Sequence, residues 1–315
     1  MSPAAALASG VFLAYSRLAV IVLGGAGFLL FVLSHGFGKQ IDSIWRTFRG
    51  WLVILPIVLA CIFAGRGATI VGVALLAMTA FKEFARATGL YRDWWMTGAV
   101  HCGIIALAVT SFVRDPWLDL PGWYGLFMAL PVYVVSLLLI IPIARNQAKG
   151  QLQNTALAIA AFVYLGWMFG HVGFLANSPH AYGYLLFLVL AVAGTDVAAF
   201  TCGKLFGGRK LRDVISPNKT WGGSIGAFVV AMILPWLMRW SFPHFGPVQL
   251  LLTGVIVGVG GQLGDLTISM IKRDIGVKDM GALIPGHGGL LDRIDSLVFV
   301  APLFFHMVRW YYDVY

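Results

Sequence analysis

Charged side chains are scarce in this sequence. Asp, Glu, Lys and Arg make up 11% of the 315 residues, whereas hydrophobic residues make up 59%, and the mean hydropathy is +0.85. The apolar share exceeds the roughly 45 to 50% that is typical of soluble domains. The composition therefore excludes an ordinary soluble domain and predicts an integral membrane protein.

Cysteine is equally scarce. Cys61, Cys102 and Cys202 all fall within apolar segments, are odd in number and form no C-x-x-C pair. This pattern indicates neither a disulfide framework nor a zinc site. We expect the three side chains to act as small hydrophobic core residues.

Long basic runs are also missing, although the net charge is +9. Because no run of five or six basic residues occurs, we expect no nucleic-acid partner. The excess of Lys and Arg agrees better with the topology of a membrane protein. The opening "MSPAAALASG" lacks the basic residues that precede a cleavable signal, so the first apolar stretch is predicted to be a membrane span.

The apolar segments predict an all-α, polytopic membrane protein with about ten transmembrane helices and cytoplasmic catalytic loops, since a spanning helix needs about 20 mainly apolar residues. They lie near residues 11–34, 51–65, 67–81, 97–113, 123–144, 155–176, 182–203, 222–239, 248–271 and 295–313. The second and third are short and joined only through Gly-Arg-Gly, so a re-entrant pair or one broken element is an alternative to two spans.

Basic residues alternate between the loops. The loops after the first, third, fifth, seventh and ninth segments hold 17 of the 22 Lys and Arg residues. Cytoplasmic loops carry such an excess. We therefore predict that both termini lie outside, that these five loops face the cytoplasm, and that the protein resides in the cell inner (cytoplasmic) membrane.

Acidic residues are concentrated toward the end of the chain. Glu83 is the only glutamate, and eight of the twelve aspartates lie from Asp196 onward. We predict a scaffold of about six spans in residues 1–180 and a catalytic region in residues 181–315. Asp196 and Asp265 lie inside apolar segments, where an ionised carboxylate is costly, so a functional role is expected; a structural pair with Lys or Arg is the alternative.

Asp292 and Asp295 are three residues apart, which places both carboxylates on one face of a helix. Acidic residues at a helix start also complement the helix dipole, and that role would explain this pair by itself. The preceding "IPGHGG" adds glycines, which allow a tight turn whose N–H groups bind phosphate at a helix start. His287 in this turn is either an acid or base, or a hydrogen-bonding group that orients phosphate.

The loop after the seventh segment, "GKLFGGRKLRDVISPNKTWGG", carries five cations. They fix the topology, hold anionic lipid head groups, or bind a substrate phosphate. Taken with the membrane-embedded aspartates, the Lys, Arg and Gly turns favour a divalent cation between carboxylates and a polyphosphate. Mg²⁺ fits, with a second cation as an option.

The stretch "SMIKRDIGVKDMGALIPGHGGLLDRIDS", residues 269 to 296, resembles the C-terminal signature of phosphatidate cytidylyltransferases, also called CDP-diacylglycerol synthases. "ISPNKTWGGSIGA" resembles the family's S-P-x-K-T-W-x-G motif, and "GQLGDL" resembles its Q-x-G-D segment. The resemblance covers residues 194 to 296, while the first half is similar only in hydropathy. It implies a membrane-embedded nucleotidyltransferase of phospholipid biosynthesis that converts CTP and phosphatidate to CDP-diacylglycerol and pyrophosphate.

The resemblance also implies roles for individual residues. Asp265 and Asp292 would bind metal, with Asp196 and Asp295 as second ligands or supports. CTP phosphates would be neutralised by Lys219, Lys272, Arg273 and Arg293, with Ser216, His287, Gly288 and Gly289 in the same site. Lys204 and Lys210 would lie near the lipid phosphate or the leaving pyrophosphate.

Two departures from the family pattern indicate a divergent branch. Ile268 stands where members usually carry a glutamate, and Asp196 is followed by Val197 and Ala198 where a small residue and a glycine are usual. Another lipid phosphate as acceptor, or a non-catalytic regulator that binds CTP or lipid, is therefore an alternative. A membrane transporter is a third, although we find no internal repeat. Expected partners are CTP, phosphatidate or a related lipid phosphate, and the bilayer, with a homodimer as an option.

Overall fold

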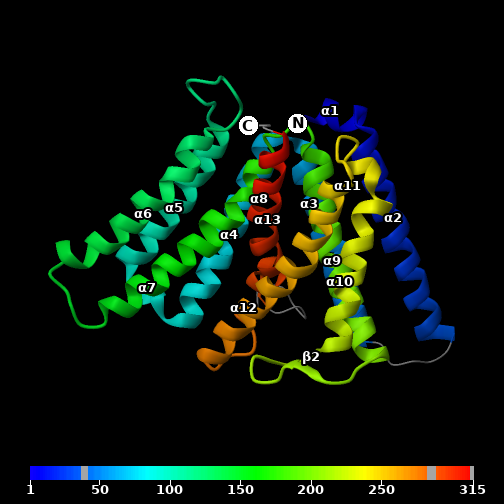
Figure 1. Ribbon diagram of the computed structural model, residues 1–315. Coiled ribbons are helices and arrows are strands. Elements are labelled where there is room, and N and C mark those ends of the chain that lie inside the picture. Colours follow the sequence, from blue (N-terminus) through cyan, green and yellow to red (C-terminus); the bar gives the residue numbers. More distant parts are fainter. Residues whose placement is uncertain (37–41, 282–288, 313–315) are drawn as a thin grey trace.

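The computed structural model describes residues 1–36, 42–281 and 289–312 (Figure 1). Helices make up most of this part of the chain. The elements are α1 (Pro3–Ala8), α2 (Gly10–Phe31), η1 (Val32–Gly36), α3 (Asp42–Ala64), α4 (Arg66–Thr88), η2 (Leu90–Arg92), α5 (Trp94–Phe112), α6 (Tyr124–Ala144), α7 (Gln151–Ala161), η3 (Phe162–Met168), α8 (Phe169–Leu175), α9 (Ala181–Leu205), β1 (Lys210–Arg212), β2 (Ser216–Thr220), α10 (Trp221–Leu237), η4 (Arg239–Ser241), α11 (Pro247–Val255), η5 (Ile256–Gly260), α12 (Gly261–Asp274) and α13 (Leu291–Tyr312).

The helices confirm the predicted all-α, polytopic class. Each of the ten predicted segments coincides with a helix or with a continuous helical rod; α7, η3 and α8 form one such rod, and α11, η5 and α12 form another. Seven helical segments in the described residues are long and apolar enough to cross a membrane. Any further spans stay a prediction.

The second and third segments are longer than predicted. Helices α3 and α4 have 23 residues each, and they are separated at Gly65, whose φ of 110° ends the first helix. Residues 82–88, predicted as loop because they carry charges, continue α4. They remain helical because Glu83, Phe84 and Ala85 are buried against the rest of the protein.

A short hairpin interrupts the helical fold between α9 and α10, and the sequence analysis did not predict it. β1 pairs with β2 in antiparallel register, with Lys210 opposite Thr220 and Arg212 opposite Ser216. The charged, proline-containing segment lacks the alternation of apolar and polar residues that marks a half-buried strand. The hairpin nevertheless has a defined position, because Thr220 ends β2 and caps α10 by accepting a hydrogen bond from Gly223 N (3.2 Å).

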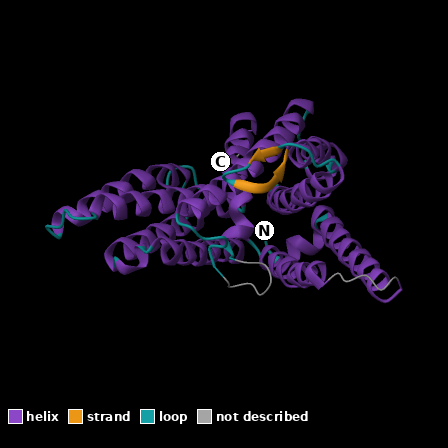
Figure 2. Ribbon diagram, turned by 90° about the horizontal axis from the view of Figure 1, so that it is seen from below, coloured by secondary structure: helices purple, strands orange, loops and turns teal. Residues whose placement is uncertain are grey.

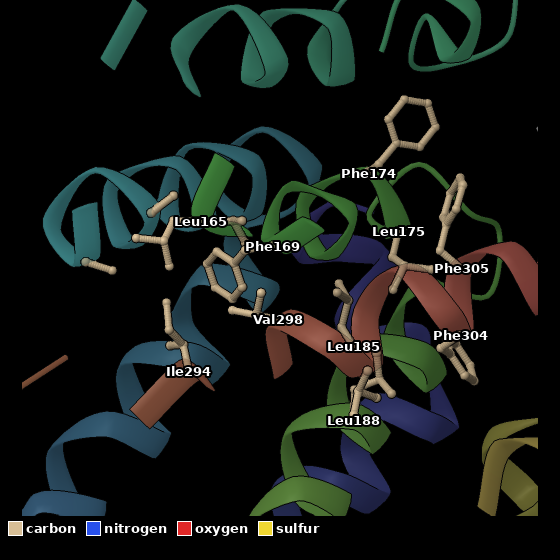
Figure 3. Packing of buried hydrophobic residues seen from close by; sticks show 14 of the residues in the cluster. Leu165, Phe169, Phe174, Leu175, Leu185, Leu188, Ile294, Val298, Phe304 and Phe305 are labelled. Atoms are coloured by element: carbon tan, nitrogen blue, oxygen red, sulfur yellow. The ribbon is translucent and has the colours of Figure 1, made fainter. Parts of the chain in front are cut away.

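Helix α13 lies at the centre of the bundle and packs against α12, α8, α9 and η3. In Figure 3, Ile294 and Val298 from α13 lie near Leu165 and Phe169, while Phe304 and Phe305 lie farther along the same helix. All of these side chains are buried. In a bilayer the lipid is as apolar as the core, so this close packing, rather than removal from water, holds the helices together.

Small residues let neighbouring helices approach closely. A Cβ added to Gly223 of α10 would lie 2.6 Å from the carbonyl oxygen of Ala199 in α9. One added to Gly264 of α12 would lie 2.9 Å from Cα of Ser296 in α13. Contacts below 3.0 Å are not tolerated, so glycine is required at both crossings.

The start of α1 and the end of α13 lie at one end of the bundle, and the hairpin lies at the other with the end of α12 (Figure 1). Figure 2, seen from below, shows the hairpin crossing this lower face. The predicted catalytic loops thus gather at one end of the helices.

Candidate active site

The hairpin brings Lys219 to Asp265. Lys219 Nζ lies 2.5 Å from Asp265 Oδ2, and the two side chains are 28% and 33% exposed. Ser269, one turn farther along α12, donates its hydroxyl hydrogen bond to Asp265 Oδ1 (3.2 Å). Lys219 and Asp265, which are 46 residues apart in sequence, therefore bring two motifs together at one carboxylate.

Three aspartates from three helices lie within each other's electrostatic field. Asp196 comes from α9, Asp265 from α12 and Asp295 from α13. Asp295 is buried, and its Oδ1 accepts a hydrogen bond from the backbone N–H of Ser296 (2.6 Å). The positive charges that act on Asp196 come from Lys219 and Arg293. Asp196 is exposed and Asp265 is partly exposed, whereas Asp295 is buried. The three carboxylates therefore concentrate negative charge beside a largely apolar bundle, which a bound cation would offset.

Asp292 forms the second part of the site, next to the loop end of α12. Lys272 Nζ donates to Asp292 Oδ1 (2.6 Å), and the backbone N–H groups of Gly289 and Met280 donate to Asp292 Oδ2 (3.1 and 3.3 Å). The pair is well shielded, with side chains only 15% and 9% exposed. Asp292 and Asp295 both belong to the first turns of α13, as their spacing predicts.

Tyr164, from η3 in the first half of the chain, joins α12 to α13. Its hydroxyl lies 3.3 Å from the carbonyl oxygens of both Gly264 and Asp295 and donates its one hydrogen to either of them. Gly264 precedes Asp265, so one tyrosine holds the backbone beside both aspartates. Sequence analysis missed Tyr164, because an aromatic residue in an apolar segment carries no signal of its own.

Gln262 ties the Q-x-G-D segment to α10. Its Nε2 donates to the carbonyl oxygens of Gly258 (2.8 Å) and Ser224 (3.2 Å), and Ser224 Oγ donates to its Oε1. The amide therefore spans the gap between the two helices. Its contacts orient α12 rather than reach toward a substrate.

The other predicted residues occupy varied positions. Lys204, at the end of α9, lies over the ring of Phe200 with Nζ 4.3 Å from the centroid. Lys210 is exposed on β1 and Ser216 begins β2. Arg273 Nε donates to the carbonyl oxygen of Ile215 (3.4 Å), which fastens α12 to the hairpin. His287 and Gly288 lie outside the described residues.

The predicted phosphate turn has part of its hydrogen bonding satisfied by the protein. Gly289 N–H donates to Asp292, as described above, and Leu291 N–H donates to Glu83 Oε2 (2.9 Å). A phosphate held at the start of α13 would therefore use other donors. Glu83 is the only glutamate in the sequence, and this rarity beside a predicted span end is the signal that could have pointed to the site.

The two departures from the family motifs lie in different environments. Ile268 is fully buried, so its side chain serves the packing of the hydrophobic core. Val197, next to Asp196, is 64% exposed. In a membrane-spanning helix an exposed apolar side chain faces lipid, so Val197 suits a lipid-facing surface of α9.

Comparison with known proteins gives one consistent result. A model of the cytidylyltransferase family matches residues 45–311. A phosphatidate cytidylyltransferase from Staphylococcus aureus (strain COL) is 36% identical over 254 residues, which cover 80% of this chain and 92% of that protein. "Uncharacterized protein YnbB" from Escherichia coli (strain K12) is 30% identical over 293 residues, covering 90% of this chain and 92% of that protein.

The similarity extends well beyond the motifs at the end of the chain. The family match begins in α3 and ends in α13, so it includes the helices that supply Glu83 and Tyr164 as well as those that supply the aspartates. This membrane protein belongs to the cytidylyltransferase family.

Proposed function

We propose that the protein catalyses the reaction of CTP with phosphatidate to give CDP-diacylglycerol and pyrophosphate. The observation that carries this proposal is that α12 forms two lysine–aspartate pairs, one with the hairpin through Asp265 and Lys219 and one with α13 through Lys272 and Asp292. The phosphatidate cytidylyltransferase names of the Staphylococcus relatives support the choice of substrates.

The carboxylates fit Mg²⁺ bound together with a substrate. Among the described residues, no three His, Cys, Asp or Glu side chains form a ready-made metal cage. Mg²⁺ typically needs only one or two protein carboxylates, because substrate phosphates and water complete its shell. We propose Asp265 of α12 and Asp292 of α13 as the oxygen ligands, with Asp196 and Asp295 as second ligands or supports. A bound Mg²⁺ would neutralise phosphate charge and orient the triphosphate.

The protein's own residues then have defined tasks. A phosphate monoester has a second pKa of about 6, so the phosphatidate oxygen is already ionised at neutral pH and needs no general base. That oxygen attacks the α-phosphorus of CTP; a new P–O bond forms, the bond between the α-phosphorus and its bridging oxygen breaks, and pyrophosphate leaves. Lys219, Lys272, Arg273 and Arg293 would hold the phosphates together against their mutual repulsion.

The lipid substrate explains why such chemistry resides in a membrane protein. The acyl chains would stay among lipids while the phosphate reaches the hairpin and the ends of α12 and α13. We propose that this end faces the cytoplasm, where CTP is present, in agreement with the distribution of Lys and Arg. The division into a scaffold (1–180) and a catalytic region (181–315) stays a prediction, and Tyr164 and Glu83 both contact the second half.

The test is Mg²⁺-dependent pyrophosphate release by the purified protein from CTP, with and without phosphatidate. We expect release only when phosphatidate is present and at least a 1,000-fold lower rate in Asp292→Asn, measured on protein that remains folded. Release that begins only with another lipid phosphate would replace the acceptor. Wild-type rates in Asp292→Asn would remove Asp292 from the site.

A further inference from the structure

Glu83 reaches the candidate site from the other half of the chain. It lies in α4, only 8% of its surface is exposed, and its Oε2 accepts the hydrogen bond from Leu291 N–H described above. The two residues are 208 positions apart. Oε1 is buried and makes no hydrogen bond within the described residues. A buried carboxylate is costly, so its retention at this point requires a specific task.

Two glycines make room for this carboxylate. A Cβ added to Gly281 would lie 2.6 Å from Cδ of Glu83, and one added to Gly289 would lie 2.7 Å from Oε2. Both distances are below the 3.0 Å that real Cβ atoms respect. Gly281 has no positive φ in the structure, so the requirement there is steric: the backbone passes directly over Glu83.

The same backbone also holds Asp292. Met280 N–H and Gly289 N–H, which donate to Asp292 Oδ2, belong to the two stretches that pass over Glu83. A Cβ on Gly289 would lie 3.1 Å from Asp292 Oδ2 as well. Glu83 thus contacts both backbone stretches that fix Asp292, and it also binds the first turn of α13.

We propose that Glu83 is a positioning residue that fixes Asp292 in the orientation needed for turnover. Its side chain packs against the backbone at Gly281 and Gly289, and its carboxylate accepts the hydrogen bond from Leu291 at the start of α13. This inference rests on the proposed function. The N–H group of Leu291 and the positive end of the α13 dipole compensate the negative charge of Glu83. A carboxylate is therefore tolerated at this buried position.

The position of Glu83 argues against a simple capping role. A helix start is usually satisfied by a local Ser, Thr, Asp or Asn side chain. Here the acceptor comes from α4 instead, so the contact also ties the first half of the chain to the catalytic motifs. A local side chain would cap α13 equally well but would leave Gly281 and Gly289 unsupported.

Two substitutions separate positioning from metal ligation. Glu83→Gln keeps the length and an oxygen acceptor for Leu291 N–H but removes the charge, whereas Glu83→Asp keeps the charge and withdraws the carboxylate by one methylene. Positioning predicts that Gln retains at least one third of the wild-type kcat/KM while Asp loses at least 30-fold. A ligand role predicts the reverse order and would overturn the proposal.

Hydrogen exchange of the purified full-length protein, followed by mass spectrometry, gives a readout that does not depend on turnover. We expect the amide of Leu291 to exchange at least 10-fold faster in Glu83→Asp than in Glu83→Gln, with little change in α9. Lys82→Met is the matched control, because it removes an exposed charge from the adjacent position of α4. Equal exchange at Leu291 in all variants would refute the positioning role.

A double variant tests the coupling to the glycines. Gly281→Ala should lower kcat/KM at least 30-fold, because its methyl group meets Glu83. The double variant Glu83→Ala, Gly281→Ala should have a kcat/KM no lower than that of the poorer single variant, because both substitutions disrupt the same contact between Glu83 and Gly281. Additive losses in kcat/KM would contradict this contact. If the wild-type protein releases no pyrophosphate with any lipid phosphate, the proposed function fails, while exchange at Leu291 still decides whether Glu83 fixes this backbone.

Discussion

Lys219 Nζ and Asp265 Oδ2 lie 2.5 Å apart, so the hairpin is fastened to α12 at the centre of the candidate site. Both partners are partly exposed, which permits either to exchange its counterion for a substrate or a cation. The pair therefore connects the S-P-x-K-T-W and Q-x-G-D motifs, which are far apart in the sequence.

Removal of the Lys219 charge should impair turnover far more than stability. We expect Lys219→Met to lower kcat/KM for CTP about 100-fold, because one charge-assisted contact to a phosphate is typically worth that much in the transition state. Steady-state pyrophosphate release measures the effect. Arg212→Met, which removes an exposed charge from the same hairpin, is the control. A loss below threefold in Lys219→Met would exclude a phosphate contact.

Gly264→Ala should separate α12 from α13. A Cβ at this position would lie 2.9 Å from Ser296 Cα and 3.0 Å from the carbonyl carbon of Asp295, so backbone rather than a flexible side chain must move. We expect a cost of about 1 to 3 kcal/mol in the free energy of unfolding and loss of activity.

A helical glycine elsewhere provides the control for this change. Gly98 in α5 has nothing within 4 Å of an added Cβ, so Gly98→Ala should leave stability unchanged or raise it by up to about 1 kcal/mol. Thermal unfolding in detergent compares the two variants. Equal midpoints would show that the helices are not in close contact at Gly264.

Tyr164→Phe should weaken the junction without breaking it. The variant keeps the ring and loses only the hydroxyl that donates to Gly264 or Asp295. A neutral hydrogen bond contributes about 0.5 to 1.5 kcal/mol, so we expect a small fall in stability and a three- to tenfold lower kcat. An unchanged kcat would mean that the backbone beside the aspartates needs no such support.

The end of the bundle opposite the hairpin should be sensitive to acid. His244 lies between η4 and α11, its ring stacks on that of His180 with centroids 3.8 Å apart, and its Nε2 lies 2.6 Å from the hydroxyl of Tyr184. Burial, followed by the charge of His180, lowers the pKa of His244 to about 4. Its contribution to stability is therefore complete above about pH 6.5, the usual histidine value, and is lost as pH falls toward 4.

Thermal unfolding measured from pH 7.5 to pH 4 checks this dependence. The midpoint should fall across that interval, because the unfolded chain takes up the proton first. His244→Asn should flatten the decline. A midpoint independent of pH in the wild-type protein would show that the stacked histidines do not oppose protonation.

The apolar segments of the sequence were sufficient to predict the helices, whereas the functional roles of the site residues stay predictions. Asp265 was noticed as a carboxylate inside an apolar segment and Asp292 through its spacing from Asp295, whereas the roles of Lys219 and Lys272 were implied by the family resemblance; the structure brings the four side chains into two pairs. Glu83 was not assigned a role, because its partners are backbone groups of distant residues.

Two other features were beyond what the sequence could reveal. The hairpin depends on a paired register that its polar residues do not mark. Tyr164 acts through carbonyl groups, which every residue carries, so no local pattern distinguishes it from other aromatic residues in apolar segments. For Tyr164 the missing information is which distant segments touch, whereas for the hairpin it is how two adjacent polar segments pair.

The crossing of α12 and α13 at Gly264 has a mechanical consequence. The backbones touch there with no side chain between them, so the helices are able to pivot about this point but not to slide past each other. Lys272 lies eight residues beyond the pivot, about 12 Å along the helix axis. A small change in the crossing angle of the two helices would therefore separate Lys272 from Asp292 more than it separates Asp265 from Asp295, because displacement grows with distance from the pivot.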